Sequence, residues 1–218
     1  MIKLNMTIAE AVKTNPDIID LLSEYGIDYC CQGSRKLLGA IEDKKLVADE
    51  FVRELNNVPT SSGNVAFKDA LKLDKPENKK MLIAYIIKQH HRLEEKLLSE
   101  LDGYLPILLR VHYDEHSEEL SELYKNFSQL KAELTVHMTE EERSEFPKIL
   151  SAENYDSTEL RAEHEIIEGL IHEIKFMTNA FSPPPDCCQT YELSFARLKE
   201  LYDDIHQHFF LENHILFT

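Results

Sequence analysis

The chain has 218 residues with 40 acidic and 24 basic side chains, a formal charge of −16 at pH 7. This balance disfavours nucleic-acid binding, because neutralising phosphates requires clustered Lys and Arg. The first residues lack the apolar run of a secretory signal, and no stretch reaches the 18 apolar residues of a membrane span. We therefore expect a cytoplasmic protein that binds neither nucleic acid nor a membrane.

Residues 1–58 are predicted to form a small helical domain. Thr7 suits the N-cap of a first helix, Pro16 suits the first turn of a second, and Gly26 ends it. A further helix is expected over residues 37–55. The chain is then predicted to be helical from its first residues onward.

The four cysteines form two vicinal pairs, Cys30–Cys31 and Cys187–Cys188. A disulfide between neighbours is strained, and reduced thiols are expected in the cytoplasm. Cys30 and Cys31 are candidates for a redox or transfer role. The alternative is a small buried hydrophobe beside an incidental neighbour.

A polar segment with Pro and Gly, residues 56–64, indicates a domain boundary. We predict a linker over 59–75 and a second domain over 76–218. Its first helix is expected from about 77 to 102 and to end at Gly103 and Pro106.

A looser stretch with His112 and His116 leads into the second helix, and Pro147 follows its end. The prolines within residues 182–186 separate the third helix from the fourth. Nothing alternates with period two for long, so the fold class is all-α, with an up-down-up-down bundle as the second domain.

Five of the ten histidines have a glutamate four residues later, so this spacing alone is weak evidence. Helical phase separates two of these pairs from surface ion pairs. His137 and Glu141 end one apolar stripe, and His208 and Glu212 lie in another, so both pairs face a core. Buried carboxylates need a partner or a metal ion.

His164 lies on a third apolar stripe, and the first helix carries His90 and His91. Each half of the bundle then offers one helix with His and one with His and Glu. Periodicity leaves the choice between His90 and His91 open. Four imidazoles and two bridging carboxylates suit two non-haem iron ions, with room for an oxo or hydroxo bridge and a small ligand.

The motifs together resemble those of the Repair of Iron Centres family of di-iron proteins. They are Asp28-Tyr-Cys-Cys-Gln-Gly33, His137-x3-Glu141-x4-Phe146-Pro147, Ala162-Glu-His164, Pro183-Pro-Pro and His208-x3-Glu212-Asn. The resemblance covers nearly the whole chain and implies a twin-cysteine domain followed by a hemerythrin-like bundle. The iron ligands that it implies are His91, His137, Glu141, His164, His208 and Glu212, with the two glutamates bridging.

The resemblance selects His91 because the family's first histidine lies 21 residues before a Val-His pair, which matches His112 here. It implies repair of iron-sulfur clusters damaged by nitric oxide or oxidants, with a labile di-iron centre as iron donor. A nitric-oxide or nitrite reductase is the alternative, followed by an oxygen- or iron-sensing module. Expected partners are iron-sulfur proteins or their assembly machinery, nitric oxide or dioxygen, with a homodimer as an option.

Overall fold

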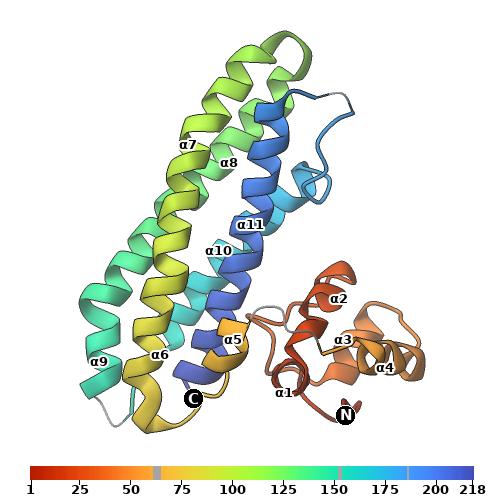
Figure 1. Ribbon diagram of the computed structural model, residues 1–218, viewed down its shortest axis with the longest axis vertical. Helices are drawn as coiled ribbons and strands as arrows, with labels where there is room; N and C mark the ends of the chain where they lie inside the picture. The colour runs from red at the N-terminus through yellow and green to blue at the C-terminus, as the bar shows by residue number, and fades with distance from the viewer. Residues whose placement is uncertain (61–64, 152–153, 186) are drawn as a thin grey trace. The chain divides into compact units, whose positions relative to one another are not determined.

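The computed structural model describes residues 1–60, 65–151, 154–185 and 187–218 (Figure 1). Within these ranges the regular structure is helical, apart from an isolated antiparallel bridge between Thr7 and Lys36. The chain divides into two compact units, residues 1–82 with 206–218 and residues 83–205. The prediction of an all-α fold is confirmed.

The N-terminal part of the first unit consists of short helices. They are α1 (Ile8–Thr14), α2 (Ile19–Glu24), α3 (Leu37–Asp43), α4 (Ala48–Asn57) and α5 (Val65–Ala70), with a 3-10 turn at Pro16–Ile18. Thr7 caps α1 as expected: its hydroxyl accepts from the Glu10 backbone N–H at 3.1 Å, and the Glu10 carboxylate accepts from the Thr7 N–H at 2.6 Å. This reciprocal capping fixes where α1 begins.

The single helix expected over 37–55 is wrong. The chain leaves α3 after Asp43 and passes through Lys45, whose φ of 57° is left-handed, before α4 begins at Ala48. The predicted linker over 59–75 contains helix α5, and its residues 61–64 lie outside the described part of the chain.

The second unit is built from long helices that run alongside one another (Figure 1). They are α7 (Arg92–Val111), α8 (Tyr113–Glu140), α10 (Thr158–Met177) and α11 (Gln189–Leu211) up to residue 205. Helix α6 (Lys79–Ile86), which belongs to this unit from residue 83, leads into α7, and α9 (Phe146–Ser151) follows α8. Lys131 pairs with Asp102 at 2.6 Å between α8 and α7, and Arg197 pairs with Glu100 at 2.8 Å between α11 and α7.

Helix α7 does not end at Gly103 and Pro106, contrary to the prediction, but continues to Val111. Leu101, Leu105 and Leu108 on its inner face are all buried. Burial of this apolar face outweighs the lost backbone hydrogen bond and the crowding that proline brings to a helix interior.

Pro147 does not mark the end of helical structure either. It is the second residue of α9, which follows the turn η4 without a break, so the chain stays helical through Pro147. The looser stretch is confined to His112, between α7 and α8, and to His116, whose φ of −137° is not helical. No described helix has both the length and the apolarity needed to cross a bilayer.

Candidate metal centre

Three π turns interrupt the helices at candidate ligands. The turn η3 (Ile87–His91) ends on His91, η4 (Glu141–Glu145) begins with Glu141, and η5 (Glu212–Leu216) begins with Glu212. A π turn inserts one residue into an α-helix and is frequent at functional sites. It changes which neighbouring side chains face inward.

The first of these turns explains why periodicity could not choose between His90 and His91. Both histidines are buried, with exposed fractions of 3% and 0%. His90 Nδ1 lies 3.1 Å from an oxygen of Asp204, whereas His91 Nε2 lies 3.4 Å from Glu141 Oε2. Of the two, His91 therefore faces a candidate ligand.

The two oxygens of the Glu141 carboxylate face different histidines. Glu141 Oε2 faces His91, and Glu141 Oε1 lies 3.4 Å from His137 Nε2. His137 Nε2 in turn lies 3.2 Å from His164 Nε2. Facing ring nitrogens at this distance have the spacing of two ligands on one metal ion, because each metal–nitrogen bond is about 2.0–2.1 Å.

The second ring nitrogen of two of these histidines is held by a carboxylate. His91 Nδ1 lies 2.9 Å from Glu142 Oε1, and His137 Nδ1 lies 2.8 Å from Glu163 Oε2. This arrangement directs each Nε2 toward the site and is typical of metal-bound histidines. Burial raises the pKa of Glu142, but hydrogen bonds from His91 and Arg92 outweigh it and hold that pKa below its ordinary value.

The C-terminal segment of the first unit carries the other two predicted ligands. His208 lies in the last turn of α11, and its Nε2 is 3.4 Å from Oε1 of Glu212. Both side chains are fully buried. The distance matches that between His137 and Glu141, so the two His-x3-Glu segments have the same local geometry.

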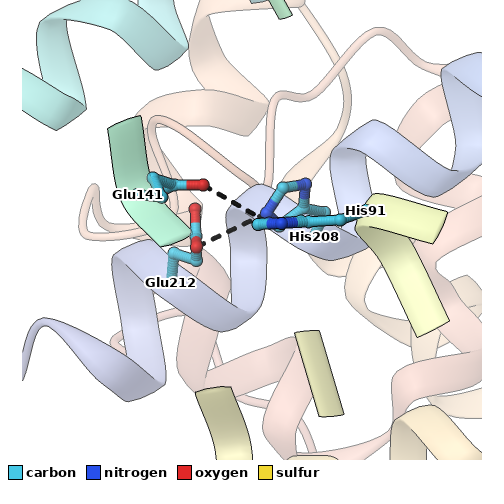
Figure 2. Close-up of side chains that lie close together, drawn as sticks. All are labelled: His91, Glu141, His208 and Glu212. Atoms are coloured by element: carbon cyan, nitrogen blue, oxygen red, sulfur yellow. Dashed lines mark ion pairs between the residues drawn. The ribbon is translucent and has the colours of Figure 1, made fainter. Parts of the chain in front are cut away.

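Two buried groups of four side chains each place one ligand atom per residue within 4.8 Å of the others. The first group is His91, Glu141, His208 and Glu212, which Figure 2 shows with both ion pairs dashed. The second is His137, Glu141, His164 and Glu212. Each group holds two imidazoles and shares both carboxylates with the other, a donor set that fits two non-haem iron ions.

Phe146, five residues after Glu141, packs against one of the candidate ligands. It is the residue directly after the turn η4 and is 2% exposed. Its ring stacks on His91 with centroids 5.7 Å apart and planes at 21°. The aromatic face therefore holds the imidazole in place from the side.

The twin-cysteine loop lies against the segment that carries Glu212, within the first unit. Asp28 Oδ1 accepts from the backbone N–H groups of Cys30 and Cys31, both at 2.9 Å. His214 Nε2 and Asn213 Nδ2 donate to the Cys30 carbonyl at 2.8 and 3.2 Å. The two thiols lie 3.6 Å apart and form no disulfide, with Cys30 buried and Cys31 partly exposed.

A cavity of about 110 Å³ lies beside His137 in the second unit. Its lining includes three carboxylates, Glu133, Glu140 and Glu163, and the aliphatic side chains of Val136, Ile166 and Ile167. The carboxylate that holds His137 thus also borders this cavity.

Sequence reasoning missed Glu142 and Glu163 as partners of the candidate ligands. A signal was present, because each is the sequence neighbour of a predicted ligand, in Glu141-Glu142 and Glu163-His164. Their partial exposure, 28% and 37%, gives them the appearance of ordinary surface carboxylates.

Comparison with known families matches both parts of the chain. Residues 81–218 match the hemerythrin HHE cation binding domain, which is more than half of the sequence. Residues 4–59 match ScdA_N, described as a domain of unknown function (DUF542). The longer match defines the class, a helical cation-binding domain of the hemerythrin type.

Curated relatives span the whole chain. The iron-sulfur cluster repair protein ScdA of Staphylococcus haemolyticus is 31% identical over 100% of this chain and 99% of its own length. The iron-sulfur cluster repair protein YtfE of Escherichia coli O81 is 30% identical over 96% of this chain and 94% of its own length. The chain therefore belongs to the ScdA/YtfE family of iron-sulfur cluster repair proteins.

Proposed function

We propose that this protein repairs iron-sulfur clusters damaged by oxidative or nitrosative stress, by donating iron from a labile di-iron centre. The ligands in this proposal are His91, His137, Glu141, His164, His208 and Glu212. The names of the full-length relatives support the repair role. The match to a cation-binding domain supports the metal centre.

The sharing of both carboxylates between two buried groups is the observation that carries the proposal. A carboxylate in an apolar core is costly unless a partner or a metal ion offsets its charge. Glu141 directs its two oxygens to two different histidines. Such a carboxylate is suited to bridge two ions rather than to bind one.

The ligand chemistry favours release of iron to a damaged cluster. Imidazole and carboxylate ligands bind ferrous iron, which lies low in the Irving–Williams order, less firmly than most later metals. The thiolates and sulfides of a damaged cluster are soft ligands with a preference for iron in clusters. Transfer from nitrogen and oxygen ligands to sulfur ligands is then favourable.

The acidic cavity beside His137 offers a route for the transferred iron. Glu133, Glu140 and Glu163 would attract a divalent cation at the moment it leaves the imidazole. Cys30 and Cys31 are proposed as the residues that help pass iron to the client, because thiols share the ligand preference of the cluster. The proposed partners are iron-sulfur proteins or their assembly machinery in the cytoplasm.

A transfer experiment tests this function directly. Iron-loaded protein is mixed anaerobically with an apo iron-sulfur enzyme, cysteine and sulfide, and the iron content of both proteins is measured over time. We expect recovery of the client's activity with a matching loss of iron from the donor. Production of nitrous oxide from added nitric oxide, with both irons retained and no client recovery, would show a reductase instead.

A double variant and a control test whether the acidic cavity, rather than the proposed metal site itself, controls the rate of iron release. Glu133→Gln and Glu140→Gln together neutralise two carboxylates of the cavity and leave all six proposed ligands in place. We expect two irons to bind but to leave more slowly. Lys131→Gln, on the same helix, is the control and should transfer iron at the wild-type rate.

A further inference from the structure

A cavity of about 220 Å³ lies among the short helices of the first unit, beside the twin-cysteine loop. Its apolar wall is formed by Ile8 at the start of α1, Ile27 after α2 and Ala40 on α3, all of them buried. Its polar lining includes Asp28 and Gln32, which lie on either side of the two cysteines in the sequence. The proposed iron centre uses none of these residues.

The cavity is lined by two cationic side chains that differ in their partners. Arg35 is paired with Asp43 and donates to Gln32 Oε1 at 2.8 Å. Lys44, the C-cap of α3, forms no ion pair among the described residues. Gly26 has a φ of 65°, and a Cβ there would lie 3.2 Å from Lys44 Nζ, so glycine leaves room for this ammonium. Lys44 is thus the group available to a negatively charged ligand.

The two thiols beside the cavity differ in access. Cys30 is buried, and its Sγ lies 3.3 Å from Asp28 Oδ1 and 3.6 Å from Cys31 Sγ. Cys31 is partly exposed, and its sulfur lies within 4.8 Å of a carboxylate oxygen of Asp28, which borders the cavity. Exchange between a thiol and a disulfide requires access of the attacking sulfur to its target. Of the two, Cys31 can therefore reach a molecule held in the cavity.

We propose that the cavity binds one half of a small disulfide that carries a carboxylate, and that Cys31 exchanges with this disulfide. The carboxylate pairs with Lys44, and the methylene groups lie against the apolar wall. The Cys31 thiolate attacks the nearer sulfur of the bound disulfide, and the bond between the two sulfurs breaks. The other half leaves as a thiolate and takes up the proton that Cys31 lost. The products are a mixed disulfide on Cys31 and one small thiol, and the disulfide itself is the oxidant.

The modification is reversible and specific to one sulfur. A second small thiol can attack the mixed disulfide and restore Cys31. Closure of a bond from Cys30 to Cys31 is disfavoured, because a disulfide between neighbours is strained. The site is independent of the proposed iron centre, since residues 8–44 supply all of it.

The test compares three small disulfides of similar size, which are anionic (dithiodipropionate), neutral (hydroxyethyl disulfide) and cationic (cystamine). Full-length protein is reduced, freed of reductant and mixed with each reagent, and mass spectrometry of its peptides follows the adduct on every cysteine. We expect dithiodipropionate to modify Cys31 before the other cysteines. In Lys44→Gln this rate should fall about two- to fivefold, the effect of one exposed ion pair. The rate with the neutral reagent should stay unchanged, and the rate with cystamine should not fall.

Neighbouring residues give matched controls. Lys45→Gln changes an exposed lysine that does not line the cavity, and it should react as wild type does. Cys31→Ser should abolish the fast adduct, whereas Cys188→Ser, at an exposed cysteine of the other pair, should keep it. The proposal is wrong if Lys44→Gln reacts with dithiodipropionate as fast as wild type, or if it slows with all three reagents alike. Equal slowing in Lys45→Gln would show a general effect of surface charge and would also overturn it.

Discussion

The two His-x3-Glu segments share one local geometry but lie in different surroundings. In both, the histidine and glutamate are 3.4 Å apart and a π turn begins at the glutamate. After Glu141 the chain continues into α9, and the outer nitrogen of His137 is held by a partly exposed carboxylate. After Glu212, His214 and Asn213 are bonded to the twin-cysteine loop.

Comparing the two segments distinguishes the features that metal binding would require from the features that differ in their surroundings. The shared part, histidine, glutamate and π turn, is what would bind a metal ion. The segment at 137–141 borders an acidic cavity, which suits exchange of ions with solvent. The residues just after Glu212 are bonded to the backbone carbonyl of Cys30, which suits a link between the proposed metal centre and sulfur chemistry.

The strongest test of the proposed di-iron centre removes one of the two proposed bridging carboxylates at a time. Glu141→Leu and Glu212→Leu should each reduce iron from two per chain to less than one, because both groups use both carboxylates. Iron analysis with visible spectroscopy measures this. Glu140→Leu, an exposed neighbour, should keep both irons, and a wild type with one zinc per chain would refute the di-iron centre.

The phenylalanines after the two turns should have unequal effects. Phe146 is 2% exposed and stacks on His91, so Phe146→Ala should destabilise the protein by about 3–5 kcal/mol. Phe217 is only half-buried, and Phe217→Ala should cost about 1–2 kcal/mol. Urea unfolding of the two variants compares them, and equal losses would mean that the two turns are supported alike.

The contact between the second segment and the cysteine loop depends on Gly33. A Cβ at this position would lie 2.4 Å from His214 Nε2 and 2.5 Å from the Tyr29 carbonyl oxygen. Gly33→Ala should therefore cost about 3 kcal/mol, at the upper end for overpacking, since backbone cannot move aside. Adding His214→Ala to this variant should recover only part of the lost stability. Full recovery of the free energy of unfolding, measured in urea, would show that the clash is with the His214 side chain alone.

The smallest expected effect concerns the carboxylate behind His137. Glu163→Gln keeps the shape but weakens the support of the imidazole, so iron affinity should fall about 10–100-fold. Competition with a chelator measures this change. Glu159→Gln, one turn earlier on α10, is the control. An iron affinity equal to that of wild type in Glu163→Gln would show that Glu163 does not support the metal centre.

The sequence predicted best what depends on helical period. Apolar stripes with a period of 3.6 marked His137, Glu141, His164, His208 and Glu212 as inward-facing, and all five are buried. That prediction works because burial of an apolar stripe dominates the orientation of an amphipathic helix. Which of these residues bind metal stays a proposal.

What the sequence missed depends on local departures from that period. A π turn shifts the inward face by one residue, which is why His90 and His91 could not be separated. Pro106 lies inside α7 because packing of the surrounding leucines outweighs its local preference, which composition alone cannot weigh. Glu142 and Glu163 were missed because their roles depend on neighbours 51 and 26 residues away in sequence.

The three π turns also limit how the length of this chain can change. A π turn holds one residue more than a turn of α-helix, so the helix beyond it keeps nearly the same inward face. Deleting one residue from η3 or η4 would restore regular helix without turning α7 or α9, and the side chains within the turn, His91 or Glu141 among them, would be the ones to shift. A length change of one residue at these turns would therefore act on the proposed ligands themselves, not on the helices beyond them.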